Sequence, residues 1–261
     1  MIIFLHIPKT AGRYFIKHVH QLSGLLQLPG YPTQCTLKTK IKEKSPQIIG
    51  GHYPFEIQNV IEANCFIYIS FFRHPVDRWL SWFYHCNIER KSWIRRTINK
   101  YNRNEKKVLR ACYKKLMAHN VMTRQIGGEN LRNISHLHRG GELINAYAPK
   151  SCIGGHLYSD SEMEEILERA KNNIRQYYHY IGFQSTVDED IDHICEKFKW
   201  DRNGSSSQIK GIVKKIYFDR KDKDTIKRVQ KMNEYDLKLY EFAKDIKDKI
   251  NARPLPNNYL S

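Results

Sequence analysis

The chain opens on a run of apolar residues that leads directly into a short loop with a lysine. Residues 2–7 are apolar except for His6, and a run of this kind without helical spacing predicts a strand buried on both faces of a parallel sheet. Residues 15–26 carry apolar side chains at helical spacing. In the loop between them, backbone N–H groups and the positive end of the helix dipole converge, and Lys9 adds a charge. The sequence therefore predicts an anion site in this loop.

The loop is not a Walker A sequence. That pattern needs a glycine five residues before a Gly-Lys pair, whereas Lys9 precedes the only glycine here, Gly12. A nucleoside triphosphatase is therefore a poor match. The alternative interpretation is that Pro8 and Gly12 only mark a turn between strand and helix.

Length and charge narrow the class of protein. A chain of 261 residues with 41% apolar residues can bury the core of one large α/β domain. The net charge of +17 favours anionic partners without identifying them. No stretch approaches the roughly 20 apolar residues that cross a bilayer, and no secretory leader is visible, so we expect a cytoplasmic protein.

A histidine follows the second apolar strand. Residues 48–54 read IIGGHYP, so His52 comes directly after a short strand that ends in two glycines. In α/β sheets, chemistry is found at the carboxyl ends of the strands. The alternative is a turn histidine with no task. The preceding residues, 27–47, contain prolines among polar and basic residues and are predicted to be a surface connection.

A third apolar run leads into an arginine-bearing helix. Residues 65–72 predict another buried strand, and Pro75 suits the first turn of the helix after it. Arg73 lies at the strand exit, and the spacing Arg73-x-Pro75-x-x-Arg78-x-x-Ser81 lets an arginine and a hydroxyl clamp a second phosphate. The alternative is an ordinary amphipathic helix whose arginines are solvated.

Three blocks of the sequence together resemble a known family: HIPKTAG, GGH and FFRHPVDRWLSWFYH, in that order. They resemble the PAPS-dependent sulfotransferases, in which PAPS is 3′-phosphoadenosine 5′-phosphosulfate. The resemblance is strongest to the carbohydrate branch, which includes heparan sulfate 2-O-sulfotransferase. The resemblance implies that the first block binds the 5′-phosphosulfate through Pro8, Lys9, Thr10, Ala11 and Gly12. It implies that the second block, from Arg73 to Ser81, binds the 3′-phosphate. It also implies a P-loop-like fold and transfer activity of the EC 2.8.2 type, with PAP as the product nucleotide.

The chain departs from this family pattern at Arg13 and Tyr14, where similar proteins carry small hydroxyl residues that bind the 5′-phosphate. Arg13 either replaces that contact by charge or faces solvent. A late family loop that closes over the nucleotide has its best match at residues 204–210, which gives Ser207 and Lys210 as further contacts. The alternative for this stretch is a flexible serine linker.

The chemistry of sulfuryl transfer assigns roles to two residues. Lys9 would stabilise the charge that grows on the leaving phosphate. An alcohol needs a base to take its proton, and an imidazole has a suitable pKa, so His52, which matches the histidine of the carbohydrate branch, is the predicted general base. No metal is expected, and the pair His136 and His138 is interpreted as surface histidines.

The most basic segment lies in the middle of the chain. Residues 86–139 contain fourteen Lys or Arg and three Glu, and their helical phasing predicts an insertion over about 86–150 with an apolar side towards the core. Its basic side suits an anionic acceptor such as an acidic or sulfated glycan, or it is simply solvated. The predicted acceptor contacts are Tyr53, His85, Arg90 and Arg124, with Arg95 and Arg96 beside them.

The remaining segments predict helix, strand and helix over residues 160–199, one long helix over residues 222–250, and an irregular tail at 251–261. The expected fold is a single α/β domain over residues 1–261, P-loop-like and three-layered, with a central parallel sheet and the helical insertion.

The predicted function is transfer of the sulfuryl group from PAPS to a hydroxyl of a carbohydrate, without nucleic acid as a partner. The alternative is a non-catalytic basic protein that binds nucleic acid or another polyanion. A kinase-like enzyme is disfavoured, because neither a Walker pattern nor a Mg²⁺-binding aspartate is visible. The sequence does not determine the oligomeric state.

Overall fold

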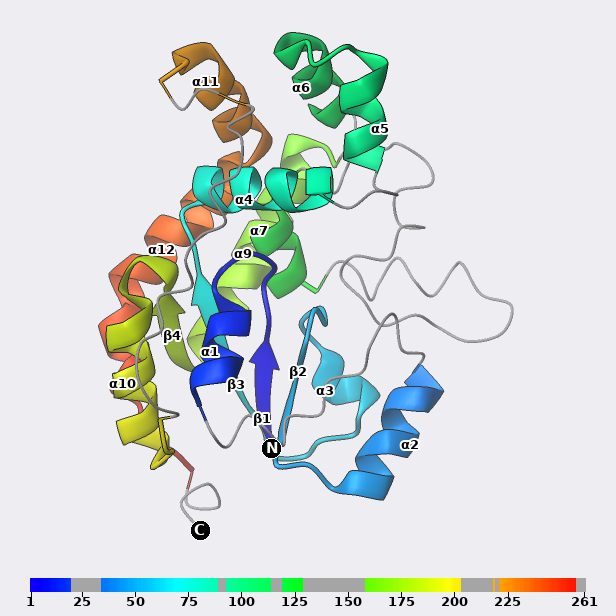
Figure 1. The fold of residues 1–261 in the computed structure, drawn as a ribbon. Coiled ribbons are helices and arrows are strands. Elements are labelled where there is room, and N and C mark those ends of the chain that lie inside the picture. Colours follow the sequence, from blue (N-terminus) through cyan, green and yellow to red (C-terminus); the bar gives the residue numbers. More distant parts are fainter. Residues whose placement is uncertain are drawn as a thin grey trace.

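The computed structural model describes residues 1–19, 34–88, 93–113, 119–128, 158–202, 218 and 221–256. Its centre is a parallel sheet of four strands in the order β2-β1-β3-β4. The strands are β1 (Ile2–Leu5), β2 (Ile48–Gly51), β3 (Ile67–Phe72) and β4 (Tyr178–Phe183). Their carboxyl ends point to the same edge, at the top of the sheet in Figure 1. The predicted α/β fold with a central parallel sheet is confirmed.

Helices cover both faces of the sheet (Figure 1). In chain order they are α1 (Gly12–His18), α2 (Gln34–Lys44), α3 (Ile57–Val60), α4 (Pro75–Ile88), α5 (Trp93–Lys100), α6 (Glu105–Tyr113), α7 (Val121–Ile126), α9 (Asp160–Tyr177), the 3₁₀ turn η4 (Gln184–Thr186), α10 (Val187–Phe198), α11 (Lys223–Met232) and α12 (Glu234–Asn251).

Alternate residues of β1 enter two different cores, as the two-residue repeat of a strand requires. Ile3 and Leu5 join a core with α7, α9 and α12, whereas Ile2 and Phe4 join a core with α1 and α10. A third core, formed by α4, α5, α6 and α11, contains Trp79 and Phe83 at its centre. The sheet is thus the middle of three layers, with a helical assembly beyond its carboxyl edge.

Two predictions about helices are wrong. The segment expected to be a surface connection contains α2, which docks on the core through Leu37 and, one turn later, the half-buried Ile41. The long C-terminal helix is broken at Asn233, which separates α11 from α12. There the buried Asn233 side chain donates to the Val229 carbonyl at 2.9 Å and accepts from Arg78 at 3.2 Å. A side chain that bonds to a nearby carbonyl competes with helix continuation.

Among the described helices, none is long and apolar enough to span a membrane. The division into one domain with an insertion over 86–150 and a tail from 251 stays a prediction. Of the predicted insertion, α5 and α6 lie in the third core, whereas α7 contributes Met122 and Ile126 to the core beneath the sheet. Beyond α12, residues 252–256 form no helix or strand.

Candidate active site

The loop after β1 has a backbone that few residues adopt. Lys9 and Ala11 have φ values of 70° and 76°, which cost a residue with a side chain about 1 kcal/mol or more and cluster at ligand sites. Between them Thr10 is buried, and its hydroxyl donates to the Ile7 carbonyl at 2.7 Å. Turns with left-handed residues direct backbone N–H groups into a concavity that binds anions. The predicted anion loop therefore has a suitable backbone.

His6 lies at the base of this loop, and the sequence prediction gave it no role. Its ring is 9% exposed, stacks on Phe4 and approaches the ring of His52 with a centroid distance of 4.4 Å. A Cβ atom on Gly12 would lie 2.2 Å from Cδ2 of His6. Residue 12 is therefore a glycine because the imidazole occupies the space of a side chain. In the sequence, the position of His6 three residues before Lys9 was the signal that could have indicated its place in the site.

His52 lies next to His6, just beyond β2. Its Nδ1 is 2.7 Å from the His6 carbonyl oxygen. Since a carbonyl can only accept, Nδ1 carries the proton, and the lone pair of the neutral ring is on Nε2. Burial, together with the charges of Arg13 and Lys9, lowers the pKa of His52, although the bond to His6 acts in the opposite direction. A neutral ring at pH 7 is the form that a general base needs.

The pKa of His6 is lowered further, by burial and then by His52, Arg13 and Lys9. The charges of Lys9 and Arg13 thus reach both rings from the loop and from the first turn of α1. Arg13 itself is exposed. The carboxyl ends of β1 and β2 therefore form a positively charged environment that fits an anionic ligand.

Arg73 connects the end of β3 to the same loop. Its side chain is half-buried, and Nη1 donates to the Lys9 carbonyl at 3.3 Å. Ser81, half-buried, follows on α4, whose first residue is Pro75. The structure therefore brings Lys9, Arg73 and His52 to one edge of the sheet, as the sequence predicted for their positions.

Three other predicted residues are buried. Arg124 is 4% exposed and donates to the His119 carbonyl at 3.2 Å, with its guanidinium 5.6 Å from the Tyr158 ring centroid. Tyr14 donates its hydroxyl to Asp188 of α10 at 2.8 Å. Tyr53 is buried beside Gly51. The Tyr14 hydroxyl therefore bonds away from the lysine loop, whereas the acceptor contacts predicted for Tyr53 and Arg124 stay predictions.

His85 is half-buried on α4. The predicted residues Arg90, Ser207 and Lys210, like His136 and His138, lie outside the described residues. Their roles stay predictions. Among the residues that the structure describes, no three His, Cys, Asp or Glu side chains converge to hold a metal ion.

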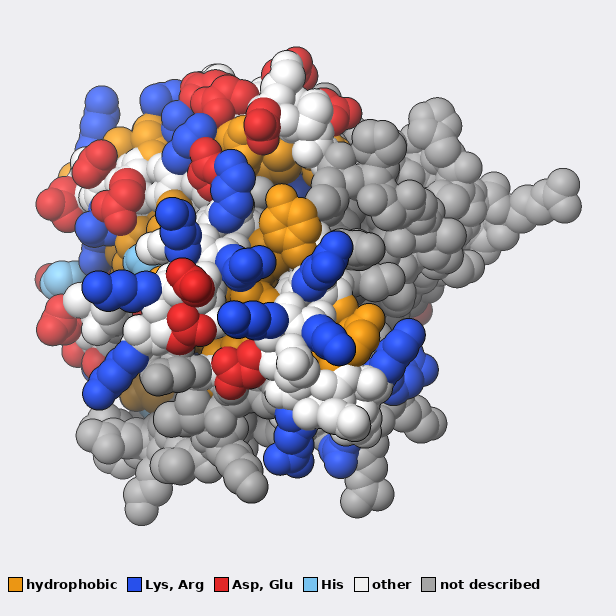
Figure 2. All heavy atoms as spheres, turned by 90° about the horizontal axis from the view of Figure 1, so that it is seen from above, with side chains coloured by type: hydrophobic (Ala, Val, Ile, Leu, Met, Phe, Trp, Pro, Cys, Tyr) orange, Lys and Arg blue, Asp and Glu red, His pale blue; other side chains and the backbone are white. Residues whose placement is uncertain are grey.

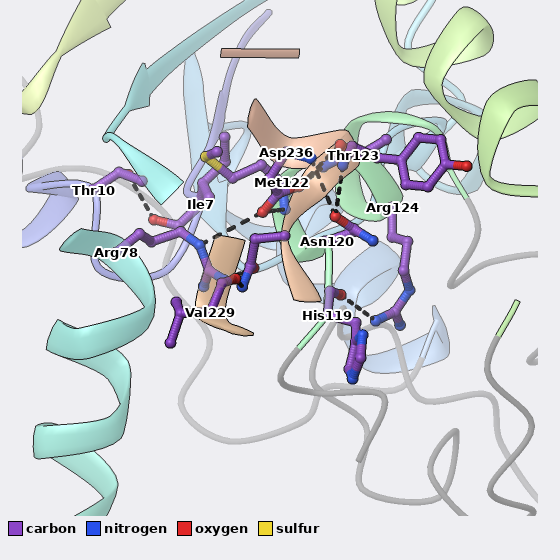
Figure 3. Close-up of polar contacts among 12 residues, drawn as sticks. Ile7, Thr10, Arg78, His119, Asn120, Met122, Thr123, Arg124, Val229 and Asp236 are labelled. Carbon is purple, nitrogen blue, oxygen red and sulfur yellow. Dashed lines mark hydrogen bonds and ion pairs between the residues drawn. The ribbon is translucent and has the colours of Figure 1, made fainter. Parts of the chain in front are cut away.

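A buried polar network links three of the helices near the site (Figure 3). Arg78 has no exposed surface, and its Nε lies 3.7 Å from Asp236. It does not belong to the solvated helix face that one interpretation expected. Asp236 also accepts from the backbone N–H and hydroxyl of Thr123, at 2.8 and 2.9 Å. The network therefore joins α4, α7 and α12.

The face seen from above is rich in cations. Figure 2 shows Lys and Arg side chains spread over it, interrupted by Asp, Glu and apolar side chains. In α5, α6 and α11, which lie on this side of the molecule, the exposed cations are Arg95, Arg96, Lys100, Lys106, Lys107, Arg110, Lys223, Lys227, Arg228 and Lys231, the last of which pairs with Glu234. This surface suits an anionic partner, although solvated charges look the same.

Comparison with known proteins identifies the family of this chain. A model of the sulfotransferase family matches residues 1–243, which include β1, the lysine loop, His52, Arg73 and most of α12. The search of curated proteins finds no match. Since the family model spans nearly the whole chain and includes both blocks that are predicted to bind phosphate, the chain belongs to the sulfotransferase family.

Proposed function

We propose that the protein transfers the sulfuryl group of PAPS to a hydroxyl of a carbohydrate, in the manner of the heparan sulfate 2-O-sulfotransferase branch. The proposal rests on the position of His52 beside the lysine loop. Nδ1 of His52 lies 2.7 Å from the carbonyl oxygen of His6, the residue at the base of that loop. A base beside an anion loop is what transfer to an alcohol requires. PAPS, when bound, supplies the sulfuryl group and a phosphate leaving group.

Each residue of the site then has one task. Nε2 of His52 takes the proton of the attacking hydroxyl as the oxygen–sulfur bond forms. Lys9 and the loop from Pro8 to Gly12 offset the charge left on the 5′-phosphate as its bond to sulfur breaks. Arg73 and Ser81 hold the 3′-phosphate. Arg13 adds charge from the first turn of α1.

We further propose that the acceptor is anionic, because the exposed cations Arg95 and Arg96 of α5 lie within the most basic part of the chain. An acidic or already sulfated glycan would be attracted to this surface, and the attraction would weaken with salt. A screen of neutral, carboxylated and sulfated oligosaccharides with labelled donor measures this preference. Equal transfer to neutral and charged acceptors would remove the argument from charge.

Calorimetry tests the proposed function against its alternative. PAP, ATP and a duplex oligonucleotide are titrated into the protein at two salt concentrations. A transferase prefers PAP, because only PAP carries both a 3′- and a 5′-phosphate. A general polyanion binder would instead prefer the duplex, with an affinity that falls steeply as salt rises. That result would replace the enzyme with the alternative that the basic surface favours.

A further inference from the structure

Gln125 of α7 is fully buried, yet its side chain bonds to two loops of the candidate site. Its Nε2 donates to the Tyr53 carbonyl at 2.8 Å and to the His6 carbonyl at 3.3 Å. Its Oε1 is buried and finds no hydrogen-bond partner in the described part of the chain. A buried acceptor without a hydrogen-bond partner is costly. The two hydrogen bonds donated by Nε2 must therefore hold the side-chain amide in this orientation.

The two carbonyls lie on either side of His52. One belongs to Tyr53, the next residue, and the other is the His6 oxygen that also accepts from Nδ1 of His52. A carbonyl oxygen has two lone pairs, so the Gln125 amide and the His52 ring share it. The amide therefore restrains both the backbone that carries the histidine and the acceptor that fixes its tautomer.

The helix α7, which carries this amide, is itself well anchored. All six of its residues are buried, and the Gln125 carbonyl accepts from the Phe55 N–H at 2.8 Å. Asp236 caps the amino end of α7 through Thr123, as Figure 3 shows. Side chains held by packing and further hydrogen bonds position a reacting group more accurately than loops do.

We propose that Gln125 is a positioning residue that holds His52 in its Nδ1-protonated form, with Nε2 directed to the acceptor hydroxyl. The proposal rests on the proposed function, in which His52 is the base. Gln125 itself touches no reacting atom. The charged and titratable groups that act on His52 are His6, Lys9 and Arg13, and none of them is altered in the test below.

The test compares Gln125→Glu with Asn173→Asp. Both changes turn a donating amide into a carboxyl group of the same shape, and Asn173 also donates to α7, to the Ile126 carbonyl at 2.7 Å. Histidine ¹⁵N NMR gives the tautomer and titration midpoint of His52 in the free protein, and steady-state kinetics with PAPS and the best acceptor gives the pH profile of kcat/KM.

We expect Gln125→Glu to raise the His52 midpoint by about one pH unit or more. A carboxyl group that burial keeps protonated donates one hydrogen where the amide donates two, which leaves the His6 carbonyl more available to His52, and a carboxyl group that ionises stabilises the nearby imidazolium. The rising limb of kcat/KM should move with it, whereas PAP affinity should stay within about threefold, because the described hydrogen bonds of Gln125 go to His6 and Tyr53 and not to residues 8–12. Asn173→Asp should leave both midpoints unchanged.

Gln125→Met removes the hydrogen-bond donor without adding a charge. This variant tests the proposal even if the Gln125→Glu variant does not fold. We expect its His52 to populate both tautomers. The same His52 tautomer and midpoint in all three variants and the parent protein would overturn the proposal. If the parent protein transfers no sulfate but the NMR changes occur, the positioning of His52 stands and the proposed function fails.

Discussion

His52 is the residue on which the proposed chemistry depends. Its pKa is lowered below 6.5 by burial, Arg13 and Lys9. Since the neutral ring is the base, kcat/KM should be level at neutral pH and should fall as pH drops through the lowered pKa of the free protein, with a midpoint below 6.5. His52→Ala should reduce kcat by ~10² or more and leave PAP affinity nearly intact, as measured by steady-state kinetics and calorimetry.

His179→Ala is the matched control. His179 lies on β4, its pKa is also lowered by burial, and its Nδ1 also faces a main-chain carbonyl, that of Tyr177, at 3.4 Å. Its loss should not change kcat per folded molecule. Unchanged turnover in the His52 variant would remove that residue from the role of base.

Arg73 should distinguish nucleotides by their 3′-phosphate. A charge-assisted hydrogen bond contributes roughly 1.5–3 kcal/mol, so Arg73→Ala should weaken PAP by about 10- to 100-fold. Adenosine 5′-phosphate should lose much less. Competition binding with both nucleotides measures the difference, and Arg95→Ala on the exposed side of α5 is the control. Equal losses for the two nucleotides would contradict the assigned clamp.

The sequence could place some cations correctly and not others. Lys9 and Arg73 follow buried strands directly, so the parallel sheet alone brings them to one edge. Arg78 and Arg124 lie on helices, where charge favours solvent, but both are buried. The partner of Arg78 is Asp236, 158 positions further along the chain, and Arg124 donates to the main-chain carbonyl of His119. No local sequence pattern marks either contact.

At the scale of elements, α7 and α12 cap each other. The Asn120 side chain accepts from the backbone N–H groups of Tyr235 and Asp236 at 3.0 and 3.2 Å, while Asp236 accepts from those of Met122 and Thr123 at 3.2 and 2.8 Å. Free N–H groups at the amino end of a helix need such acceptors. The amino end of each helix therefore finds its hydrogen-bond acceptors only when the other helix is packed against it.

Asn120 tests this arrangement because its own φ is 44°. Asn120→Gly keeps the backbone but leaves the buried N–H groups of Tyr235 and Asp236 without their acceptor, so it should lower the free energy of unfolding by about 1 kcal/mol or more. Asn120→Ala also strains the left-handed backbone, so it should cost about 1 kcal/mol more. Urea unfolding measures both. Equal stability of the two variants would mean that the backbone conformation of residue 120 carries no strain.

The same elements show where sequence patterns suffice. All four strands were predictable because apolar runs of this length, buried on both faces, have few other solutions. The helix α2 was missed because only Leu37 and Ile41 anchor it among lysines and prolines. The break at Asn233 was missed because the apolar spacing continues through it, and the contact with Arg78 that stabilises it comes from a distant helix.

At the scale of the whole molecule, buried histidines should make stability depend on pH. Burial lowers the pKa of His119 to about 4. An unfolded chain takes up the proton below about 6.5, and the native state only near 4, so stability should be lost as pH falls from 6.5 towards 4 and should be fully present above 6.5. His119 alone contributes roughly 3 kcal/mol to this loss.

Urea unfolding at pH 7.5, 6 and 5 measures the slope. His119→Gln should flatten it, because the amide can still donate to the Tyr113 carbonyl, which His119 Nε2 approaches at 2.7 Å, but cannot titrate. His6 and His52, whose pKa values are also lowered, retain the remaining slope. An unchanged slope in the glutamine variant would show that His119 does not titrate between these limits.

The strand order has a consequence for the size of the ligand. His52 follows β2 and Arg73 follows β3, with β1 between them, and neighbouring strands are ~4.8 Å apart. The backbone positions of His52 and Arg73 are thus two strand intervals, roughly 10 Å, apart. The side chains of both residues contact the segment after β1 that lies between them. A ligand that contacts all three strand ends must be longer than a lone sulfate or phosphate ion, so inorganic anions should inhibit only weakly compared with an elongated molecule that carries charge at each end.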